Sequence, residues 1–214
     1  GESLTFDVVF QAYRMSAAPL VADVAAEYAA RRKFVEDDID SALILNTPDP
    51  VINTMFRYAK IRASESICKT SGGYMHAPGG ESYYAAIWAN DQAEYVNPFF
   101  PFLGYAVGNE SAINSFRHFA RFMNDQWEPI PSSIIAEGKD IWNGAGDRGD
   151  AAMIAYGASR YALALSDMAA AGELWPLIRW CLEYCNRKLN EGGVVASDAD
   201  ELENRFESGD ANLC

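Results

Sequence analysis

Two long stretches of this chain carry almost no charge and yet have the length of helices. Residues 95–109 contain no charged side chain, and residues 151–166 contain only Arg160. A helix that is apolar on all sides has to be surrounded by other parts of the protein. We therefore predict two inner helices, at 91–107 and 150–171, each covered by neighbouring elements.

Each predicted inner helix is followed by a segment with a single apolar stripe. In residues 111–126, Ile113 and Phe116 fall on one helical face while Arg117 falls on another, and residues 173–190 have the same pattern. An amphipathic helix buries one face and leaves the other in water. These two segments are therefore predicted to be outer helices that cover the inner ones.

The connections between the predicted helices alternate between short and long. Short turns are expected at Gly108–Asn109 and at Gly172, whereas the stretches 69–90, 127–149 and 191–209 are each about 20 residues long. Loops of that length without structure of their own are uncommon unless they carry function. The three long loops leave the same end of the helical hairpins, so they are predicted to form the working face.

A weak internal repeat supports this arrangement. Each predicted inner helix begins at an aspartate, and Asp91, Asp150 and Asp210 follow one another at intervals of 59 and 60 residues. A helical hairpin repeated around an axis forms a toroid of paired helices. The sequence thus predicts an all-α fold of about three hairpins, which is half of such a ring.

The N-terminal part has a different pattern. Residues 4–12 alternate between apolar and polar side chains as a half-buried strand does, and nothing later in the sequence has this pattern. A helix is expected within 20–38, and another from Thr47, where Pro48-Asp49-Pro50 provides a start signal, to about Cys68. The predicted organisation is the end of an N-terminal β domain at 1–19, a linker with a helix at 20–46, and the first half of the toroid at 47–214.

The composition argues against several classes of partner. Seventeen basic residues against thirty acidic ones give a net charge of −13, which repels nucleic acid and anionic membrane surfaces. The longest uncharged run contains Pro98 and Pro101 and is too short to span a membrane. With four cysteines and two histidines, we expect no metal site, no cofactor, and free thiols. The N-terminus lacks the pattern of a signal peptide, and export stays undecided.

The last long loop holds the strongest candidates for catalysis. Residues 191–210 contain seven acidic residues against a single base, Arg205, which is a candidate for substrate binding. Crowding of like charges raises carboxyl pKa values, as a general acid at neutral pH requires. The candidates are Asp200, Glu201 and Glu203, and the alternative is a solvated acidic loop without catalytic function.

The first long loop has the composition of a sugar site. Tyr74, Trp88, Asp91 and Glu94 place aromatic rings beside carboxylates, which together suit the apolar faces and the hydroxyl groups of a pyranose. The structural alternatives are that Asp91 caps a helix and that Trp88 is part of the core.

The middle loop adds three more candidates for substrate binding. They are Trp142, Arg148 and Asp150, which lie close together in the sequence before the second inner helix. Arg148 is interpreted as an ion-pair partner for the neighbouring acids, in either a functional or a structural role.

The order of these motifs resembles a known family. Gly73-Tyr74, Trp88-x-x-Asp91, Gly149-Asp150-Ala151 and a final Arg205-Phe206 are similar to the motifs of the (α/α)6 six-hairpin glycosidases over residues 48–214. The nearest groups are the glycogen-debranching glucosidase domains and the processing-α-glucosidase and trehalase group. Asn90 stands where the debranching motif has Arg.

The resemblance implies specific roles. It implies that Asp91 contacts the terminal glucose, that Glu201, four residues before Arg205, is the general acid, and that Asp200 or Glu203 takes this place in another register. It also implies a β-sandwich before the toroid and a general base in the sixth hairpin, beyond this chain.

The function expected from the sequence is therefore that of a fragment of an inverting glycoside hydrolase. Its expected partners are a carbohydrate substrate and the C-terminal half of the same protein. One alternative is an (α/α) toroid that binds carbohydrate without catalysis. Another is a toroid similar to terpenoid cyclases, because Asp198-Ala199-Asp200-Glu201 superficially resembles their acidic protonation motif.

Overall fold

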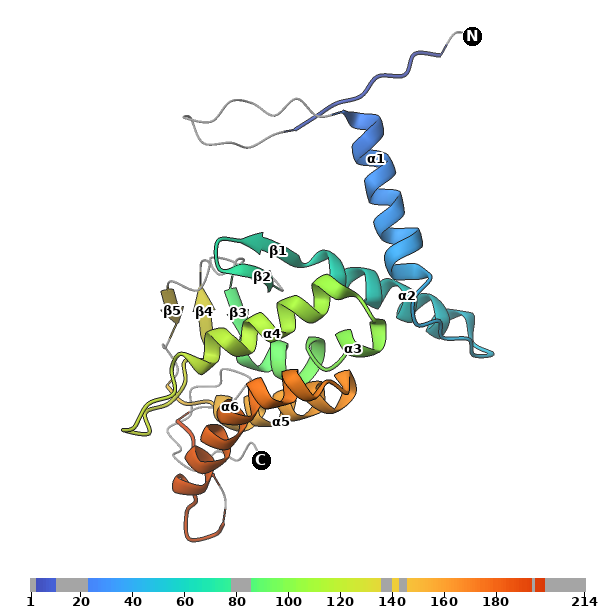
Figure 1. Ribbon diagram of the computed structural model, residues 1–214. Helices are drawn as coiled ribbons and strands as arrows, with labels where there is room; N and C mark the ends of the chain where they lie inside the picture. Colours follow the sequence, from blue (N-terminus) through green and yellow to red (C-terminus); the bar gives the residue numbers. More distant parts are fainter. Residues whose placement is uncertain are drawn as a thin grey trace, which may run out of the picture.

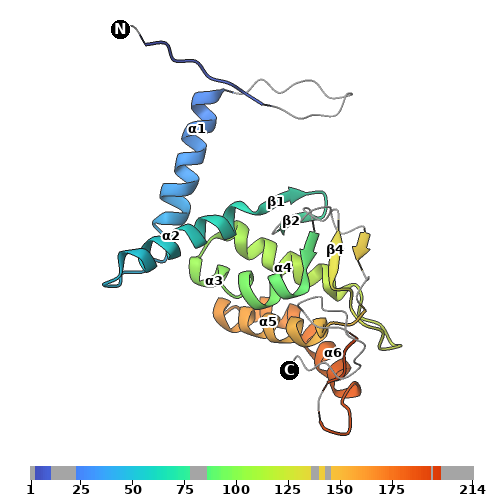
Figure 2. The same ribbon diagram turned by 180° about the vertical axis from the view of Figure 1, so that it is seen from behind.

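The computed structural model describes residues 3–10, 23–77, 86–135, 140–142, 146–193 and 195–198. The described part is mainly helical, with two small sheets at one end of the helices (Figure 1). Helix α1 (Val24–Arg32) stands away from the rest of the molecule, and α2 (Pro50–Glu65) leads from it into the body. Seen from behind, the sheets lie on the side of the body away from α1, and β1 follows directly from the end of α2 (Figure 2).

The helix predicted within 20–38 is present as α1 and its continuation η1 (Lys33–Asp40), a wider π-type helix. Asp23 caps α1 by accepting a hydrogen bond from the backbone of Ala26. The strand predicted at 4–12 is absent from residues 3–10, the part of it that the structure describes. A strand forms only against another strand, and no described segment pairs with this one.

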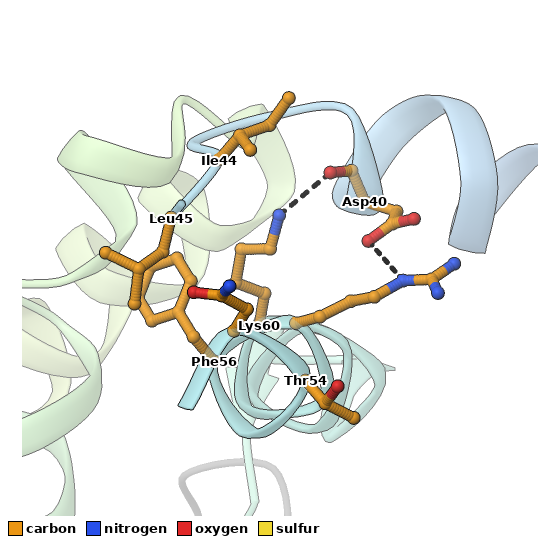
Figure 3. Close-up of a pocket in the computed structure, with 8 residues that line it drawn as sticks. Asp40, Ile44, Leu45, Thr54, Phe56 and Lys60 are labelled. Carbon is orange, nitrogen blue, oxygen red and sulfur yellow. Dashed lines mark hydrogen bonds and ion pairs between the residues drawn. The ribbon is translucent and has the colours of Figure 1, made fainter. Parts of the chain in front are cut away.

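Helix α2 begins as its start signal predicts. The Asp49 carboxylate accepts from the backbone of Val51 at 2.8 Å, and Pro50 occupies the first turn. Lys60 is buried and donates to the backbone carbonyls of Ile39, Asp40 and Ala42. Figure 3 shows this ammonium group beneath the end of η1, beside a pocket of about 210 Å³. Lys60 therefore ties α2 to η1.

The first predicted inner helix, 91–107, is broken in the structure. It consists of η3 (Asp91–Val96) and a single turn, α3 (Phe100–Leu103), which ends at Gly104 with φ 69°. Prolines lack the N–H that a continuous helix needs, and this segment contains two of them. The segment is as apolar as predicted, but the predicted continuous helix is interrupted between η3 and α3 and again after α3.

Helix α4 (Ala106–Ala120) therefore starts earlier than the predicted 111–126. The turn expected at Gly108–Asn109 is wrong, because both residues lie inside α4. Gly108 instead allows close packing, since a Cβ atom there would lie 2.3 Å from the ring of Phe100.

The second hairpin is formed by α5 (Asp150–Leu165) and α6 (Met168–Arg187). The turn between them lies at Ser166–Asp167, whereas the sequence predicts it at Gly172. Ser166 has φ 54°, and the Asp167 carboxylate accepts from the first backbone N–H groups of α6. The capping aspartate, and not the glycine, marks the boundary.

Five short strands in the described part of the chain show that the expectation of no strand after the N-terminal segment is wrong. Strands β1 (Ile67–Thr70) and β2 (Gly73–His76) form a hairpin, and β3 (Ala86–Trp88), β4 (Ser133–Ile135) and β5 (Asp140–Trp142) form an antiparallel sheet. Strands of three or four residues are too short to give a period-two pattern, so the sequence did not reveal them. The broader prediction of a mainly helical fold is confirmed.

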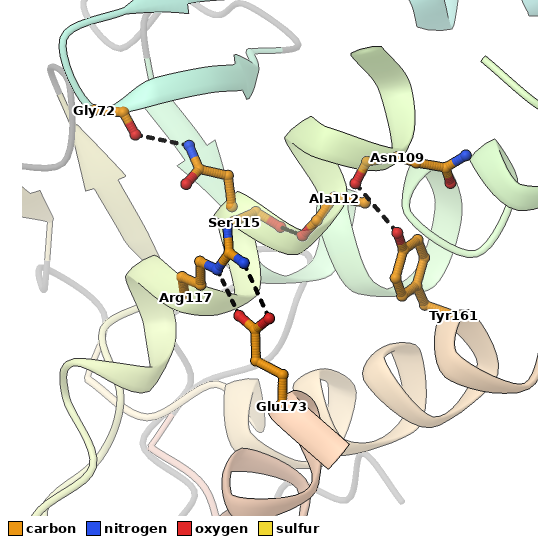
Figure 4. Close-up of polar contacts among 8 residues, drawn as sticks. Gly72, Asn109, Ala112, Ser115, Arg117, Tyr161 and Glu173 are labelled. Atoms are coloured by element: carbon orange, nitrogen blue, oxygen red, sulfur yellow. Dashed lines mark hydrogen bonds and ion pairs between the residues drawn. The ribbon is translucent and has the colours of Figure 1, made fainter. Parts of the chain in front are cut away.

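The core lies where α4, α5 and α6 meet. Phe116 and Tyr161 pack together there with ring centres 5.9 Å apart, and the Tyr161 hydroxyl donates to the carbonyl of Asn109. Arg117 of α4 makes a bidentate ion pair with Glu173 of α6 (Figure 4). These contacts fix the three helices against one another.

Helix α5 is covered less completely than an inner helix should be. Tyr156 is 56% exposed and Leu163 is 79% exposed, and a groove of about 650 Å³ runs beside Met153 and Leu182. In the described part of the chain, therefore, α5 is buried on one side only.

Gly157 of α5 packs directly against the backbone of η3. A Cβ atom on Gly157 of α5 would lie 2.2 Å from the carbonyl oxygen of Ala93 in η3. Gly157→Ala should therefore lower the free energy of unfolding by about 1 to 3 kcal/mol, because backbone atoms have to move apart. Chemical denaturation measures this change. Gly172→Ala is the matched control, since no described atom lies within 4 Å of that Cβ position, and it should stabilise the chain by up to about 1 kcal/mol.

Candidate functional site

Segments of all three long loops meet at one place. Strand β3 comes from the first loop and pairs with β4 from the middle loop, so that Ile87 lies opposite Ile134. The last loop joins them through Asp198, whose N–H donates to the carbonyl of Asp147 at 2.6 Å, while the N–H of Asp147 donates to the Asp198 carboxylate at 2.9 Å. The predicted convergence is therefore observed for the described parts of these loops.

A buried polar cluster lies in the first turn of α5. Asp150 is only 1% exposed, and its Oδ2 accepts from the Ser132 hydroxyl at 2.7 Å. The same hydroxyl accepts from Nε of Arg148 at 3.2 Å. The other carboxylate oxygen of Asp150, Oδ1, has no hydrogen-bond partner in the described structure. A buried acceptor of this kind is costly unless something else satisfies it.

Arg148 connects this cluster to the end of β3. Its side chain is buried, and the guanidinium carbon lies 5.7 Å from the centre of the Trp88 ring, in a cation–π arrangement. Asp91 follows Trp88 by three residues, and the positive charge of Arg148 partly opposes the rise in the pKa of Asp91 that burial causes. Trp88, Asp91, Arg148 and Asp150 thus form one group, which we call the Arg148 cluster.

Burial changes the acidity of both carboxylates in the Arg148 cluster. It raises the pKa of Asp150 from 3.8 to about 6, although the Ser132 hydroxyl and Arg148 oppose this rise. Burial also raises the pKa of Asp91, against the opposing effect of Arg148. Perturbed carboxylates of this kind are concentrated at functional sites.

The raised pKa of Asp150 predicts a specific dependence of stability on pH. Between about pH 4 and 6 the folded state holds a proton that the unfolded state has lost, so stability falls as pH rises through this window. Asp150→Asn removes the titration. Wild type should therefore lose about 2 to 3 kcal/mol of stability relative to Asp150→Asn when the pH is raised from 4 to 7. Urea denaturation across this range measures it, and a difference independent of pH would contradict the assignment.

Asp91 is not a helix cap. The cap position of η3 is Asn90, which makes no capping hydrogen bond through its side chain, and Asp91 is the first residue of the helix. The half-buried Asp91 carboxylate makes no hydrogen bond in the described structure. The capping alternative is therefore wrong, and the carboxylate is available to a ligand.

Two other predicted site residues lie apart from the Arg148 cluster. Tyr74 is on β2, in the other sheet, where its carbonyl accepts from the Asn114 side chain. Glu94 is on η3 and lines the apolar groove beside α5. Neither takes part in the interactions that join Arg148 to Asp150.

The remaining predicted site residues cannot be placed in the same detail. Trp142 ends β5, and only its backbone is described. The catalytic candidates Asp200, Glu201 and Glu203, together with Arg205, lie outside the described residues. Their roles stay predictions.

Three residues of the site were missed from the sequence. Ser132 bridges Arg148 and Asp150, and the Tyr184 hydroxyl of α6 donates to the buried Asp147 carboxylate. The sequence places Tyr184 in a predicted outer helix, and Ser132, next to Pro131, belongs to no motif that indicates a site. Asp147 lay within the middle loop but was not singled out.

Two other buried amide side chains donate to neighbouring elements of the core, although the amide oxygen of each has no hydrogen-bond partner in the described structure. The Gln92 side chain donates to the carbonyl of His76, and burial lowers the pKa of His76 to about 4, so this ring is neutral at pH 7. Asn97 of the break after η3 donates to Ser115 of α4. These contacts join elements of the core.

Within the described ranges, no three histidine, cysteine or acidic side chains come together as a metal ion would require. None of the helices in that part of the chain is both long and apolar enough to span a bilayer.

No family model matches the chain, and comparison with curated proteins and with solved structures finds no significant similarity. Function therefore has to be inferred from the chain's own geometry.

Proposed function

We propose that this chain is the first half of an (α/α)6 toroid and belongs to an inverting glycoside hydrolase. The observation that supports this proposal is the Arg148 cluster, in which a buried guanidinium lies over Trp88 and is linked through Ser132 to the Asp150 carboxylate, where segments of the loops meet. The proposed role of the cluster is to bind the sugar next to the bond that is cleaved.

The cluster has the groups that a sugar needs. The half-buried carboxylate of Asp91 is an acceptor without a partner in the described structure, whereas Oδ1 of Asp150 is unpaired but buried beneath the described residues. Carboxylates accept strong, charge-assisted hydrogen bonds from hydroxyl groups, and an aromatic ring packs against the apolar face of a pyranose. Two carboxylates against one guanidinium favour a neutral sugar over an anionic one.

The proposed chemistry needs a proton donor near this cluster. The chain leaves the described region at Asp198, which is hydrogen-bonded to Asp147, directly before the acidic stretch of the last loop. We assign the proton donor to Glu201, with Asp200 and Glu203 as the alternatives. In an inverting mechanism a second carboxylate activates water about 6.5 to 9.5 Å from the acid, and we assign this group to the C-terminal half.

The cyclase alternative is weaker. Asp198, the first residue of the acidic motif that suggested it, is engaged by the backbone N–H of Asp147. The polar groups of the Arg148 cluster also suit a hydroxylated ligand better than a hydrocarbon.

The experiment that tests the proposal uses the complete protein to which this chain belongs. It is incubated with a panel of neutral gluco-oligosaccharides, and the anomeric configuration of the first product is followed by NMR. Hydrolysis with inversion supports the proposal. Binding of an oligosaccharide without hydrolysis favours a carbohydrate-binding toroid, and the absence of both rejects a carbohydrate function.

A further inference from the structure

A buried hydrogen bond links α6 to the turn that carries the Arg148 cluster. Tyr184 is 1% exposed and Asp147 is 4% exposed, and the tyrosine hydroxyl donates to Oδ2 of the aspartate. Burial and the neighbouring carboxylate raise the pKa of Tyr184, so its hydroxyl keeps its proton. The second oxygen of Asp147 accepts from the backbone N–H of Gly149 at 2.9 Å. Asp147 therefore joins α6 to the turn immediately before α5.

The backbone of Asp147 also binds the last long loop, through Asp198. Asp198 is bound to it through two hydrogen bonds, one from its N–H and one to its carboxylate. Gly146 has φ 71°, and a Cβ atom there would lie 2.6 Å from the Asp198 carboxylate. The close approach of the two loops therefore requires glycine at this position.

Tyr184 is itself held in place by aromatic packing. Its ring stacks on Trp180 with ring centres 5.4 Å apart, and Trp180 stacks on Trp127 at the same distance. Rings packed in this way have little rotational freedom, so the hydroxyl group is presented to Asp147 in one orientation.

We propose that Tyr184 and Asp147 are positioning residues of the proposed glycosidase. They orient the turn that carries Arg148 and Asp150, and through Asp198 they fix where the chain enters the acidic stretch that supplies the proton donor. This inference rests on the proposed function. Neither residue touches the substrate in this role, because both act through the groups that they hold.

The test compares two tyrosine variants. Tyr184→Phe removes the hydrogen bond to Asp147, whereas Tyr161→Phe removes a hydrogen bond of another buried tyrosine, to the carbonyl of Asn109. Tyr184→Phe leaves a buried carboxylate oxygen without its donor and should lower the melting temperature more than Tyr161→Phe, which leaves a neutral carbonyl, so the comparison depends on the local readouts below. Only Tyr184→Phe should alter the site.

The first measurement is amide hydrogen exchange in the 214-residue chain. The amides of Asp147, Gly149 and Asp198 are donors in this arrangement. They should exchange roughly tenfold faster in Tyr184→Phe and at the wild-type rate in Tyr161→Phe. Unchanged exchange in Tyr184→Phe would overturn the positioning role, whatever the function of the protein.

The second measurement is the rate of the complete protein on two substrates that differ in leaving group. Tyr184→Phe should lower kcat roughly 10- to 100-fold on an unactivated oligosaccharide and much less on an activated glycoside, because a displaced proton donor matters most for a poor leaving group. Tyr161→Phe should change neither rate by more than about twofold. Equal losses on both substrates would overturn the positioning role.

A pair of variants at Asp198 completes the test. Asp198→Asn keeps an oxygen acceptor for the N–H of Asp147 and should retain activity, whereas Asp198→Ala should have the same leaving-group signature as Tyr184→Phe. If exchange responds to Tyr184→Phe but the wild-type complete protein hydrolyses no glycoside, the proposed function fails and the link between α6 and the turn is structural only.

Discussion

If the proposed glycoside hydrolase function holds, Glu201→Gln is expected to lower the turnover of unactivated oligosaccharides by the complete protein by about two to four orders of magnitude. Glutamine keeps the size and the hydrogen-bonding capacity of glutamate but has no proton to deliver to the departing oxygen. Substrates with activated leaving groups need less protonation, so their turnover should fall much less. Steady-state kinetics on both kinds of substrate measure this contrast.

Two neighbouring acids serve as controls for this assignment. Asp200→Asn and Glu203→Gln remove one carboxylate each from the same stretch, and both should be close to wild type if Glu201 is the donor. If one of them shows the leaving-group contrast and Glu201→Gln does not, the general acid is the other residue. Glu201 was chosen by counting back from Arg205, so this set of variants tests the register of the family resemblance directly.

The helices that could be predicted were those with local signals. Asp49 and Pro50 mark the start of α2, and the charge pattern distinguishes α4 and α6 from the helices that they cover. The breaks near Pro98 and Pro101 were missed because the helix was predicted from the uncharged run 95–109, which continues through both prolines. The boundaries of α4 and α6 were misplaced because glycines were taken as turns, whereas Gly108 serves packing and Gly172 lies inside α6.

The candidate site was predicted only in part, because some of its residues are joined by contacts that leave no local signal in the sequence. Trp88, Asp91, Arg148 and Asp150 flank long loops, so loop convergence alone was enough to bring them together. Ser132, Asp147 and Tyr184 contribute through contacts across 16 or more residues of sequence, which leave no local pattern. Tyr74 was placed in the site because it shares a loop with Trp88, but the β1–β2 hairpin carries it into a different sheet.

Asp91→Asn is expected to separate activity from stability. The Asp91 carboxylate makes no hydrogen bond in the described structure, and burial raises its pKa, so at neutral pH its charge destabilises the folded state. The neutral amide removes that cost without breaking a described contact. The melting temperature should therefore stay the same or rise slightly. Because an acid with a raised folded-state pKa destabilises only when it is ionised, any gain should be larger at pH 7 than at pH 4.

The catalytic efficiency of Asp91→Asn, in contrast to its stability, should fall. If Asp91 accepts charge-assisted hydrogen bonds from a sugar, the amide loses roughly 1.5 to 3 kcal/mol of transition-state binding, which corresponds to a fall in kcat/KM of about 10- to 150-fold. Glu94→Gln is the matched control, since Glu94 lies on the same helix but lines the groove beside α5; its kcat/KM should change by less than about twofold. Unchanged kcat/KM in Asp91→Asn would show that this carboxylate does not touch the sugar. Substrate binding would then have to be assigned to Asp150 and Arg148 alone.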